Sequence, residues 1–379
     1  MHQRLKILDG FRAICILSVI FFHFFSRWVA RESGVHMYPY DDQYDYFKYG
    51  YLGVRFFFII SGFVIFFTLE NTVTLKSFWI KRMIRLVPPM IIISLVILVI
   101  FRLFDTKGLF PVSHSIRNLL PGILFISPEA FNLVFQRPGI RFDYLSGSFW
   151  SLWPEVQFYL FSSLLYYFNK EKFLRNFLIG SLLMISIFWL WVNLQGANTF
   201  HIHLPVNVFD GCVLFIEIFN LPVYMVYFVV GMLFYALYKN HLQGLKNTFF
   251  LRAFFFIFML VYLYFGVQWQ VRLIYVAILA LFFAFIYFPK YLSFLEGSIL
   301  VEIGVASYAI YLIHENIGVL AINLWAGYLM PLGFVVPVLL IVLLISVSIF
   351  YTRKIDLPIS GYLKNSLLYS RKAKTGAVE

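Results

Sequence analysis

The chain has 379 residues, of which 61% are hydrophobic and only 13% are charged, and its formal net charge is +12 at pH 7. A single water-soluble core cannot bury that much apolar surface, so the composition indicates a membrane protein. The two cysteines, Cys15 and Cys212, are too few for a disulfide framework or a metal site. The positive charge does not require a nucleic-acid partner, because membrane insertion and anionic lipids both favour basic residues on one side of a bilayer.

Apolar runs of about 20 residues recur along the chain, and this is the length at which a helix crosses the hydrocarbon of a bilayer. The pattern predicts an all-α, polytopic membrane protein with about ten transmembrane helices. The predicted spans are 9–29, 50–69, 79–103, 147–168, 175–194, 218–238, 249–266, 271–289, 299–322 and 333–352. The run at 119–126 is too short to span, so it is predicted to be half-inserted or a loop. The first run lacks the cleavage pattern of a secretory signal and is predicted to be retained.

The basic residues predict how these spans are oriented. With the N-terminus inside, about twice as many lysines and arginines fall on the cytoplasmic flanks as on the outer flanks. Both termini are then cytoplasmic, and the segments 30–49, 104–146 and 195–217 lie outside. The predicted location is the inner (plasma) membrane, with a transmembrane domain at 1–352 and a basic cytoplasmic tail at 353–379 that is disordered at its end.

The first predicted helix carries two ionisable side chains that are costly in hydrocarbon, Arg12 and His23. Their spacing of eleven residues places them about 20° apart on one helix face, with a rise of about 16 Å between them. Taken alone, Arg12 fits an interfacial anchor that reaches lipid phosphate, and His23 fits a packed, hydrogen-bonded histidine. Because they share a face, the pair favours a functional site inside the bundle.

The third predicted helix opens with Arg82 and Arg85, spaced i, i+3 at its cytoplasmic end. Ordinary positive flanking of a membrane helix is one explanation for these residues. A cluster of guanidinium groups also suits a polyanionic ligand, because each group can bind two phosphate oxygens at once. Pro88 and Pro89 follow and are predicted to break the helix, as is common where a bundle lines a cavity.

Five sequence blocks, in order, resemble a known family. The first is the spacing Arg-x10-His in "RAICILSVIFFH", and the others are "GYLGVRFFFIISGFVI", "RMIRLVP", "FWSLWPEVQFYL" and "SYAIYLIH". Together they resemble the membrane acyltransferase 3 family, whose members transfer acyl groups from acyl-CoA to sugars and other acceptors outside the cytoplasm. The resemblance extends from residue 6 to about residue 350. One block departs from the family pattern, because Glu155 is followed by Val156 where many members have two adjacent acids.

The resemblance implies an integral-membrane O-acyltransferase with acyl-CoA, in the simplest case acetyl-CoA, as donor and a carbohydrate hydroxyl on the outer side as acceptor. It implies that Arg12, Arg82 and Arg85 bind the donor phosphates and that His23 is the general base. Glu155 is expected to be a catalytic residue of the same site, because a carboxylate is costly in a membrane helix. The supporting residues of the site would be Ser61, Ser151, Tyr311 and His314. For the serines and this histidine, a structural hydrogen bond is the alternative.

The segment 36–51 is rich in tyrosine and aspartate, a composition suited to binding sugar rings, although an interfacial aromatic belt would look similar. His201 and His203 are too few for a metal site, so no metal is expected. Membrane lipids are the other expected partners, and the sequence does not indicate the oligomeric state. The competing function is a transporter or flippase of polysaccharide or lipid-linked sugar, which would also use broken helices and buried charge.

Overall fold

The computed structural model describes residues 5–27, 42–137, 139–196, 206–329, 332–333 and 335–369, and within these ranges the chain is helical and contains no strand. The first half of the described chain contains α1 (Lys6–Phe22), α2 (Leu52–Glu70), α3 (Leu75–Phe104), α4 (Leu119–Leu124), α5 (Pro128–Val134), α6 (Leu152–Phe168) and α7 (Phe173–Gly196). The second half contains α8 (Val206–Ile218), α9 (Leu221–Leu242), α10 (Phe249–Tyr264), α11 (Trp269–Tyr287), α12 (Ser298–Leu329), α13 (Val335–Tyr351) and α14 (Leu357–Lys364).

Eight helical segments in the described ranges are long and apolar enough to cross a membrane. The two other predicted spans, 147–168 and 249–266, correspond to α6 and α10, which have 17 and 16 residues. At about 1.5 Å per residue these helices are about 25 Å long, close to the roughly 30 Å of bilayer hydrocarbon. The prediction of an all-α, polytopic membrane protein is confirmed, and each predicted span corresponds to a helix.

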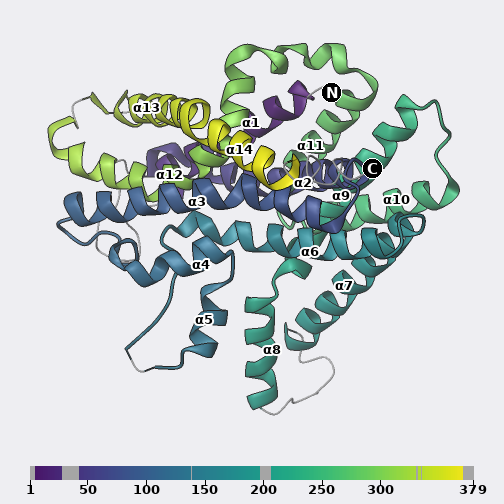
Figure 1. The fold of residues 1–379 in the computed structure, drawn as a ribbon, viewed down its shortest axis with the longest axis horizontal. Coiled ribbons are helices and arrows are strands. Elements are labelled where there is room, and N and C mark those ends of the chain that lie inside the picture. The colour runs from purple at the N-terminus through teal and green to yellow at the C-terminus, as the bar shows by residue number, and fades with distance from the viewer. Residues whose placement is uncertain are drawn as a thin grey trace, which may run out of the picture.

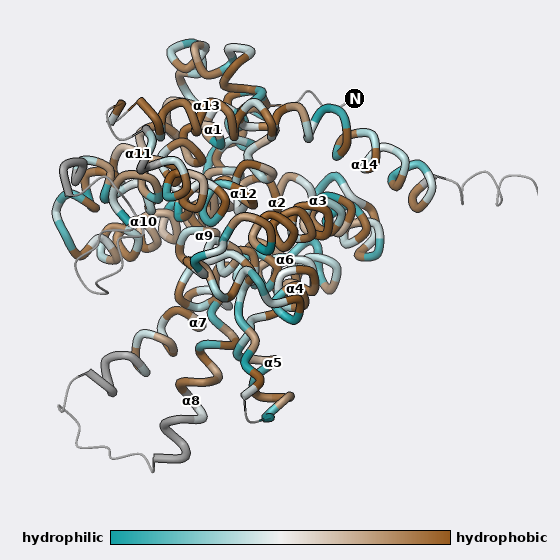
Figure 2. Tube along the Cα trace, turned by 90° about the vertical axis from the view of Figure 1, so that its left-hand side faces the viewer, coloured by the Kyte–Doolittle hydropathy of each residue, from teal (hydrophilic) through white to brown (hydrophobic). Residues whose placement is uncertain are grey.

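The helices form a bundle whose outer faces are apolar. Figure 1 shows α3, α6 and α12 running along the length of the molecule, while α7 and α8 extend away from its centre. Figure 2 shows hydrophobic residues over much of the surface. On α3 and α13, for example, Val99, Leu339 and Leu343 are more than half exposed, as lipid-facing side chains would be.

Two parts of the chain beyond the predicted spans are helical. Residues 195–217, predicted as an outer loop, include α8, and the segment Val213–Leu242 is apolar enough to form one span with α9. After α13 the chain stays helical through Thr352–Asp356, α14 and Asn365–Tyr369, and it packs against α3. The residues after 369 lie outside the described part of the chain.

The predicted break at Pro88 and Pro89 is wrong, because α3 runs uninterrupted through both prolines. A proline has no backbone N–H and leaves the carbonyl four residues earlier without its usual donor. For Pro88 that carbonyl belongs to Ile84, and it accepts a hydrogen bond of 3.5 Å from the Ser360 hydroxyl of α14. The Ser360 side chain of α14 therefore satisfies the Ile84 carbonyl that Pro88 leaves without a donor.

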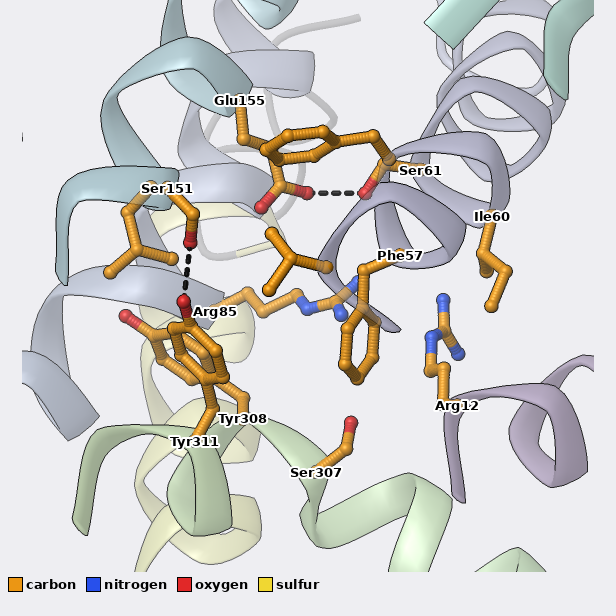
Figure 3. Close-up of a pocket in the computed structure, with 13 residues that line it drawn as sticks. Arg12, Phe57, Ile60, Ser61, Arg85, Ser151, Glu155, Ser307, Tyr308 and Tyr311 are labelled. Carbon is orange, nitrogen blue, oxygen red and sulfur yellow. Dashed lines mark hydrogen bonds between the residues drawn. The ribbon is translucent and has the colours of Figure 1, made fainter. Parts of the chain in front are cut away.

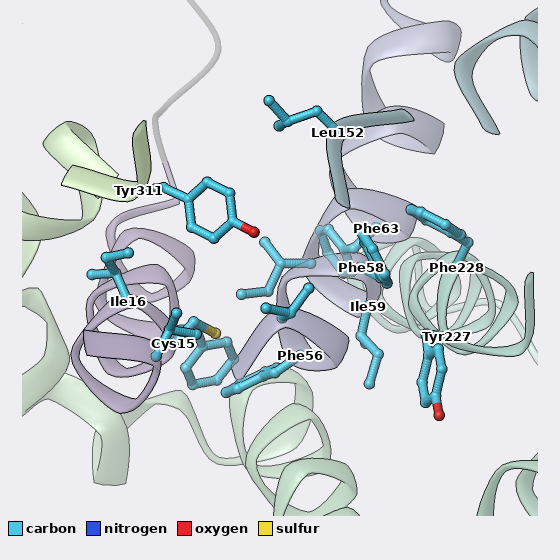
Figure 4. Close-up of a cluster of buried hydrophobic side chains, with 14 of the residues drawn as sticks. Cys15, Ile16, Phe56, Phe58, Ile59, Phe63, Leu152, Tyr227, Phe228 and Tyr311 are labelled. Carbon is cyan, nitrogen blue, oxygen red and sulfur yellow. The ribbon is translucent and has the colours of Figure 1, made fainter. Parts of the chain in front are cut away.

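Glycines allow α2 and α9 to pack with their backbones in contact. A Cβ atom on Gly62 would lie 2.1 Å from the Phe228 carbonyl oxygen, and one on Gly231 would lie 1.8 Å from the Ile59 carbonyl oxygen. Small residues at such positions are typical of close helix pairs in membranes. Around this contact, Figure 4 shows the side chains of Phe58, Phe63 and their neighbours gathered into one buried cluster that also includes residues of α1.

We expect Gly231→Ala to destabilise the protein by about 1–3 kcal/mol or more, because the added methyl group forces two buried helices apart. The midpoint of thermal unfolding in detergent would measure this. Gly211→Ala is the matched control, since a Cβ atom on Gly211 of α8 would meet nothing within 4 Å. Equal midpoints for the two variants would show that the α2–α9 contact can open without cost.

Candidate active site

Three cavities follow one another through the bundle and share lining residues. The basic cavity, of about 490 Å³, is lined by side chains that include Arg12, Lys81, Arg82, Arg85 and Lys364. The middle cavity, of about 60 Å³, shares Arg12, Arg85 and Tyr308 with the basic cavity. The outer cavity, of about 410 Å³, shares Val54 and Tyr311 with the middle cavity and contains His23. The three cavities therefore adjoin one another in this order.

The arginines of the basic cavity have different surroundings. Arg12 forms a salt bridge of 2.9 Å with Asp9, one turn earlier on α1. Arg82 is buried, donates a hydrogen bond of 2.6 Å to Thr68, and lies 5.6 Å from the ring centres of both Phe78 and Tyr159. Arg85 is exposed and lines both the basic and the middle cavity. Arg82 is therefore fixed in place, while Arg85 is open to a ligand.

The middle cavity is narrow and carries several hydroxyl groups. Ser61 of α2 and Tyr159 of α6 both donate hydrogen bonds to the Glu155 carboxylate, and Figure 3 shows Glu155 and Ser61 meeting above the cavity. Ser151 and Tyr311 form a hydroxyl pair at 2.7 Å on another side. The guanidinium groups of Arg12 and Arg85 reach the same space (Figure 3). The middle cavity is therefore lined by hydroxyl groups, one carboxylate and two guanidinium groups.

A histidine and a buried carboxylate face each other in the outer cavity. The Nε2 atom of His23 lies 3.3 Å from Oε1 of Glu315, whose side chain is 1% exposed. Arg27 lies 3.4 Å from the same carboxylate oxygen. The other oxygen of Glu315, Oε2, has no hydrogen-bond partner among the described residues. Gly147 allows this approach, because a Cβ atom there would lie 3.1 Å from both carboxylate oxygens.

The hydrogen-bond network assigns the protons of the two histidines. Nδ1 of His23 lies 2.9 Å from the Val19 carbonyl oxygen, which can only accept, so Nδ1 carries a proton. By the same argument Nδ1 of His314 donates to the Tyr311 carbonyl oxygen at 2.8 Å. Nε2 of His314 then accepts from Nδ1 of His23 at 3.2 Å. This leaves Nε2 of His23 to exchange a proton in the outer cavity, beside Glu315.

Both helices of the His23–Glu315 pair are held by local structure. α1 ends in a π-helical turn, His23–Arg27, and such turns are frequent at functional sites. On α12, Asn316 donates a hydrogen bond of 2.8 Å to Ser113, which in turn donates to the Leu145 carbonyl oxygen at 2.8 Å. The loop after α3 therefore braces α12 directly beside Glu315.

Asp105 fixes the start of that loop. Burial alone would raise the pKa of this carboxyl, but hydrogen bonds from the Phe110 N–H, His114 and the Leu109 N–H outweigh burial and hold its pKa below the usual range. The three donors lie 3.0, 2.9 and 2.8 Å from the carboxylate oxygens. The loop is thus anchored by an ionised carboxylate at neutral pH.

The sequence model of the "Acyltransferase domain" of the acyltransferase 3 family matches residues 5–351. The chain belongs to the acyltransferase 3 family. A Staphylococcus aureus (strain COL) protein named "Putative O-acetyltransferase SACOL0978" is 30% identical over 161 residues, which are 41% of this chain and 23% of that protein. The O-acetyltransferase OatA of Staphylococcus aureus (strain NCTC 8325) is 26% identical over 194 residues, 48% of this chain and 28% of that protein. The matches thus span about a quarter of these relatives. No solved structure matches the chain.

In this member of the family the predicted site residues divide among the three cavities. Arg12, Arg82 and Arg85 line the basic cavity, and Ser61, Ser151, Glu155 and Tyr311 line the middle one. His23 lines the outer cavity together with Tyr311, and His314 contacts His23 from α12. Glu155, the other predicted catalytic residue, therefore lies in a different cavity from the predicted base, His23.

Glu315 was missed by the sequence analysis, although it directly follows His314. The available signal was a carboxylate in the middle of an apolar span, which is costly unless it has a partner. Of the other sequence predictions, His201, His203 and residues 36–41 lie outside the described part of the chain. Among the described residues, no group of three or more His, Cys, Asp and Glu side chains could hold a metal ion.

Proposed function

We propose that this acyltransferase moves an acyl group, acetyl in the simplest case, from acyl-CoA on the cytoplasmic side to a carbohydrate hydroxyl on the outer side of the inner (plasma) membrane. The observation that carries the proposal is the line of three cavities, which is basic at one end and has His23 and Glu315 at the other. The Staphylococcus aureus relatives are named as O-acetyltransferases, which supports acetyl as the group transferred.

The basic cavity suits the nucleotide phosphates of acyl-CoA, because it combines several cationic side chains with a volume of about 490 Å³. The narrow middle cavity suits the pantetheine arm, which is long and thin and carries amide groups. Glu155 can accept a hydrogen bond from an amide N–H of that arm, and Ser61 holds this carboxylate in place. The rise of about 16 Å from Arg12 to His23 is the distance along which the arm would present its thioester.

The outer cavity suits the acceptor and the chemical step. Nε2 of His23 takes the proton of the acceptor hydroxyl while the hydroxyl oxygen attacks the thioester carbonyl carbon. The carbon–sulfur bond then breaks, the acyl–oxygen bond remains, and the departing CoA thiolate takes the proton back from the imidazolium. Glu315, which lies 3.3 Å from the same nitrogen, stabilises the positive charge of the imidazolium between these two events.

The function can be tested with the full-length protein in sealed vesicles of known orientation. Acetyl-CoA supplied on the side of the basic cavity should acetylate an impermeant carbohydrate confined to the other side, as detected by mass spectrometry. Surface glycans from cells with and without the protein should differ by the acyl mass. If acetyl-CoA is consumed only when donor and acceptor share one side, transfer across the membrane is wrong.

We expect Arg85→Lys to weaken CoA binding by about tenfold or more, because lysine keeps the charge but loses the two-point contact with phosphate. Isothermal titration calorimetry with CoA would measure the change. Arg102→Lys is the matched control, since Arg102 is an exposed arginine near the other end of the same helix, α3. If Arg85→Lys and Arg102→Lys bind CoA with equal affinity, Arg85 does not contact the donor phosphates.

A further inference from the structure

Arg55 of α2 has no role in the proposed reaction. It lines the outer cavity together with His23 and Glu315. The guanidinium of Arg55 donates a hydrogen bond to the Tyr275 hydroxyl, which is also 2.8 Å from the Tyr227 hydroxyl. It lies 5.4 Å from the ring centre of Tyr51 and 5.6 Å from that of Tyr227. The contacts of Arg55 are thus hydroxyl groups and ring faces.

No carboxylate balances this charge among the described residues. Arg27, the other arginine of the cavity, contacts Glu315, whereas Arg55 forms no salt bridge with a described acidic side chain. A half-buried guanidinium within a membrane helix is costly, and ring faces and neutral hydroxyls offset only part of that cost. A guanidinium that faces a cavity under these conditions is a site for an anion, which it can bind through two parallel hydrogen bonds.

The rest of the outer cavity has the character of a sugar site. Trp150 and Tyr224 pack against each other with their ring centres 5.3 Å apart, and both line the cavity together with Tyr51. The parts of these rings that face the cavity offer apolar surface on which the apolar face of a sugar ring can pack. At about 410 Å³ the cavity lies within the size range of small-molecule sites.

We propose that the acceptor is an acidic carbohydrate, one that bears a carboxylate or a phosphate, and that Arg55 binds this anionic group while the sugar ring lies against Trp150 and Tyr224. The anion would fix the sugar at one point, so that a hydroxyl at another point reaches Nε2 of His23. This inference rests on the proposed function, because it assigns a substrate class to the acceptor site of that reaction.

The test is binding of three probes to the purified full-length protein, measured by calorimetry without any acyl donor. Glucuronic acid carries a carboxylate, glucose 1-phosphate carries a phosphate, and glucose carries neither. At least one acid should bind about tenfold more tightly than glucose, and the preference should fall as the ionic strength rises. The acid that binds more tightly identifies the anionic group.

Three variants separate recognition of charge from support of the tyrosine cluster. In Arg55→Gln the ratio of acid to glucose affinity should fall to about one, and in Arg55→Lys it should take an intermediate value because the charge remains. Tyr275→Phe removes the hydroxyl that Arg55 contacts but leaves the guanidinium, so the preference should persist. Equal or undetectable binding of all three probes by the unmodified protein overturns the inference, as does a preference that survives in Arg55→Gln.

A separate measurement distinguishes this inference from the proposed function. CoA binding and acetyl-CoA consumption report on the basic cavity and on the reaction, whereas the part of the acid preference that is lost in Arg55→Gln reports on the outer cavity. A protein that prefers acids but does not consume acetyl-CoA with any acceptor refutes the proposed function and retains the anion site. A protein that acetylates neutral sugars as efficiently as acidic ones refutes the acidic acceptor and retains the function.

Discussion

Replacing His23 with alanine should lower the rate of acyl transfer by about 10²–10⁴-fold, because the acceptor hydroxyl would lose its general base. Binding of acyl-CoA should persist in this variant, since His23 lines the outer cavity and the cationic side chains line the basic one. Single-turnover acetyl transfer by the purified protein, combined with calorimetry for CoA, would measure the two effects separately.

His241→Ala is the matched control for this experiment, because His241 is an exposed histidine on α9 that contacts Tyr287 and lies far along the chain from the site. It should transfer acyl groups at the unmodified rate. Turnover by His23→Ala at a rate close to that of the control would show that another group accepts the proton, and the reaction proposed above would then need a different base.

Replacing Glu315 with glutamine should lower the rate of acyl transfer by at least about 10²-fold. Glutamine keeps the shape of the side chain but removes the charge that stabilises the imidazolium, and removing one group that stabilises developing charge in an active site costs about 10²–10³-fold. The maximal rate should fall more than the apparent affinity for either substrate, because the charge acts when the imidazolium forms. Steady-state kinetics with varied acetyl-CoA and acceptor would show this division.

Glu302→Gln provides the control on the same helix, since Glu302 lies near the start of α12, pairs with Arg353 and lines none of the three cavities. We expect little change in the transfer rate of this variant, because a surface ion pair contributes little. If Glu315→Gln retains the full rate, Glu315 serves to hold α1 and α12 together. The midpoint of thermal unfolding of this variant should then be lower than that of the unmodified protein.

The spans and the family could be predicted from the sequence because both depend on residues that are close along the chain. Hydrophobic length identifies a membrane helix, and the spacing from Arg12 to His23 can be followed on a single helix. The pairing of His23 with Glu315 joins α1 to α12, and helical periodicity in one segment does not determine which face of a distant segment it meets. For this reason His314 was identified as a supporting residue while its neighbour Glu315 was not.

The two arginines of the third helix show the same limit. The spacing of Arg82 and Arg85 predicted that both would bind donor phosphate. In the structure both side chains line the basic cavity, but Arg82 is buried against Tyr159 of α6 and Phe78, whereas Arg85 is exposed. Tyr159 is about 80 residues away along the chain, so helical spacing alone does not indicate which of the two arginines is buried.

The small volume of the middle cavity has a consequence for the membrane as a whole. A passage that joined the wide basic and outer cavities would let protons and ions flow down their gradients, and an energised membrane does not tolerate such a leak. At about 60 Å³, bordered by Phe57, Tyr308 and Tyr311, the middle cavity is several times smaller than the cavities on either side of it. A hydrated ion carries its water shell with it, so a narrow segment of this kind would impede an ion more than a thin uncharged chain. The constriction that would guide the proposed donor would then also help to preserve the electrical potential across the bilayer.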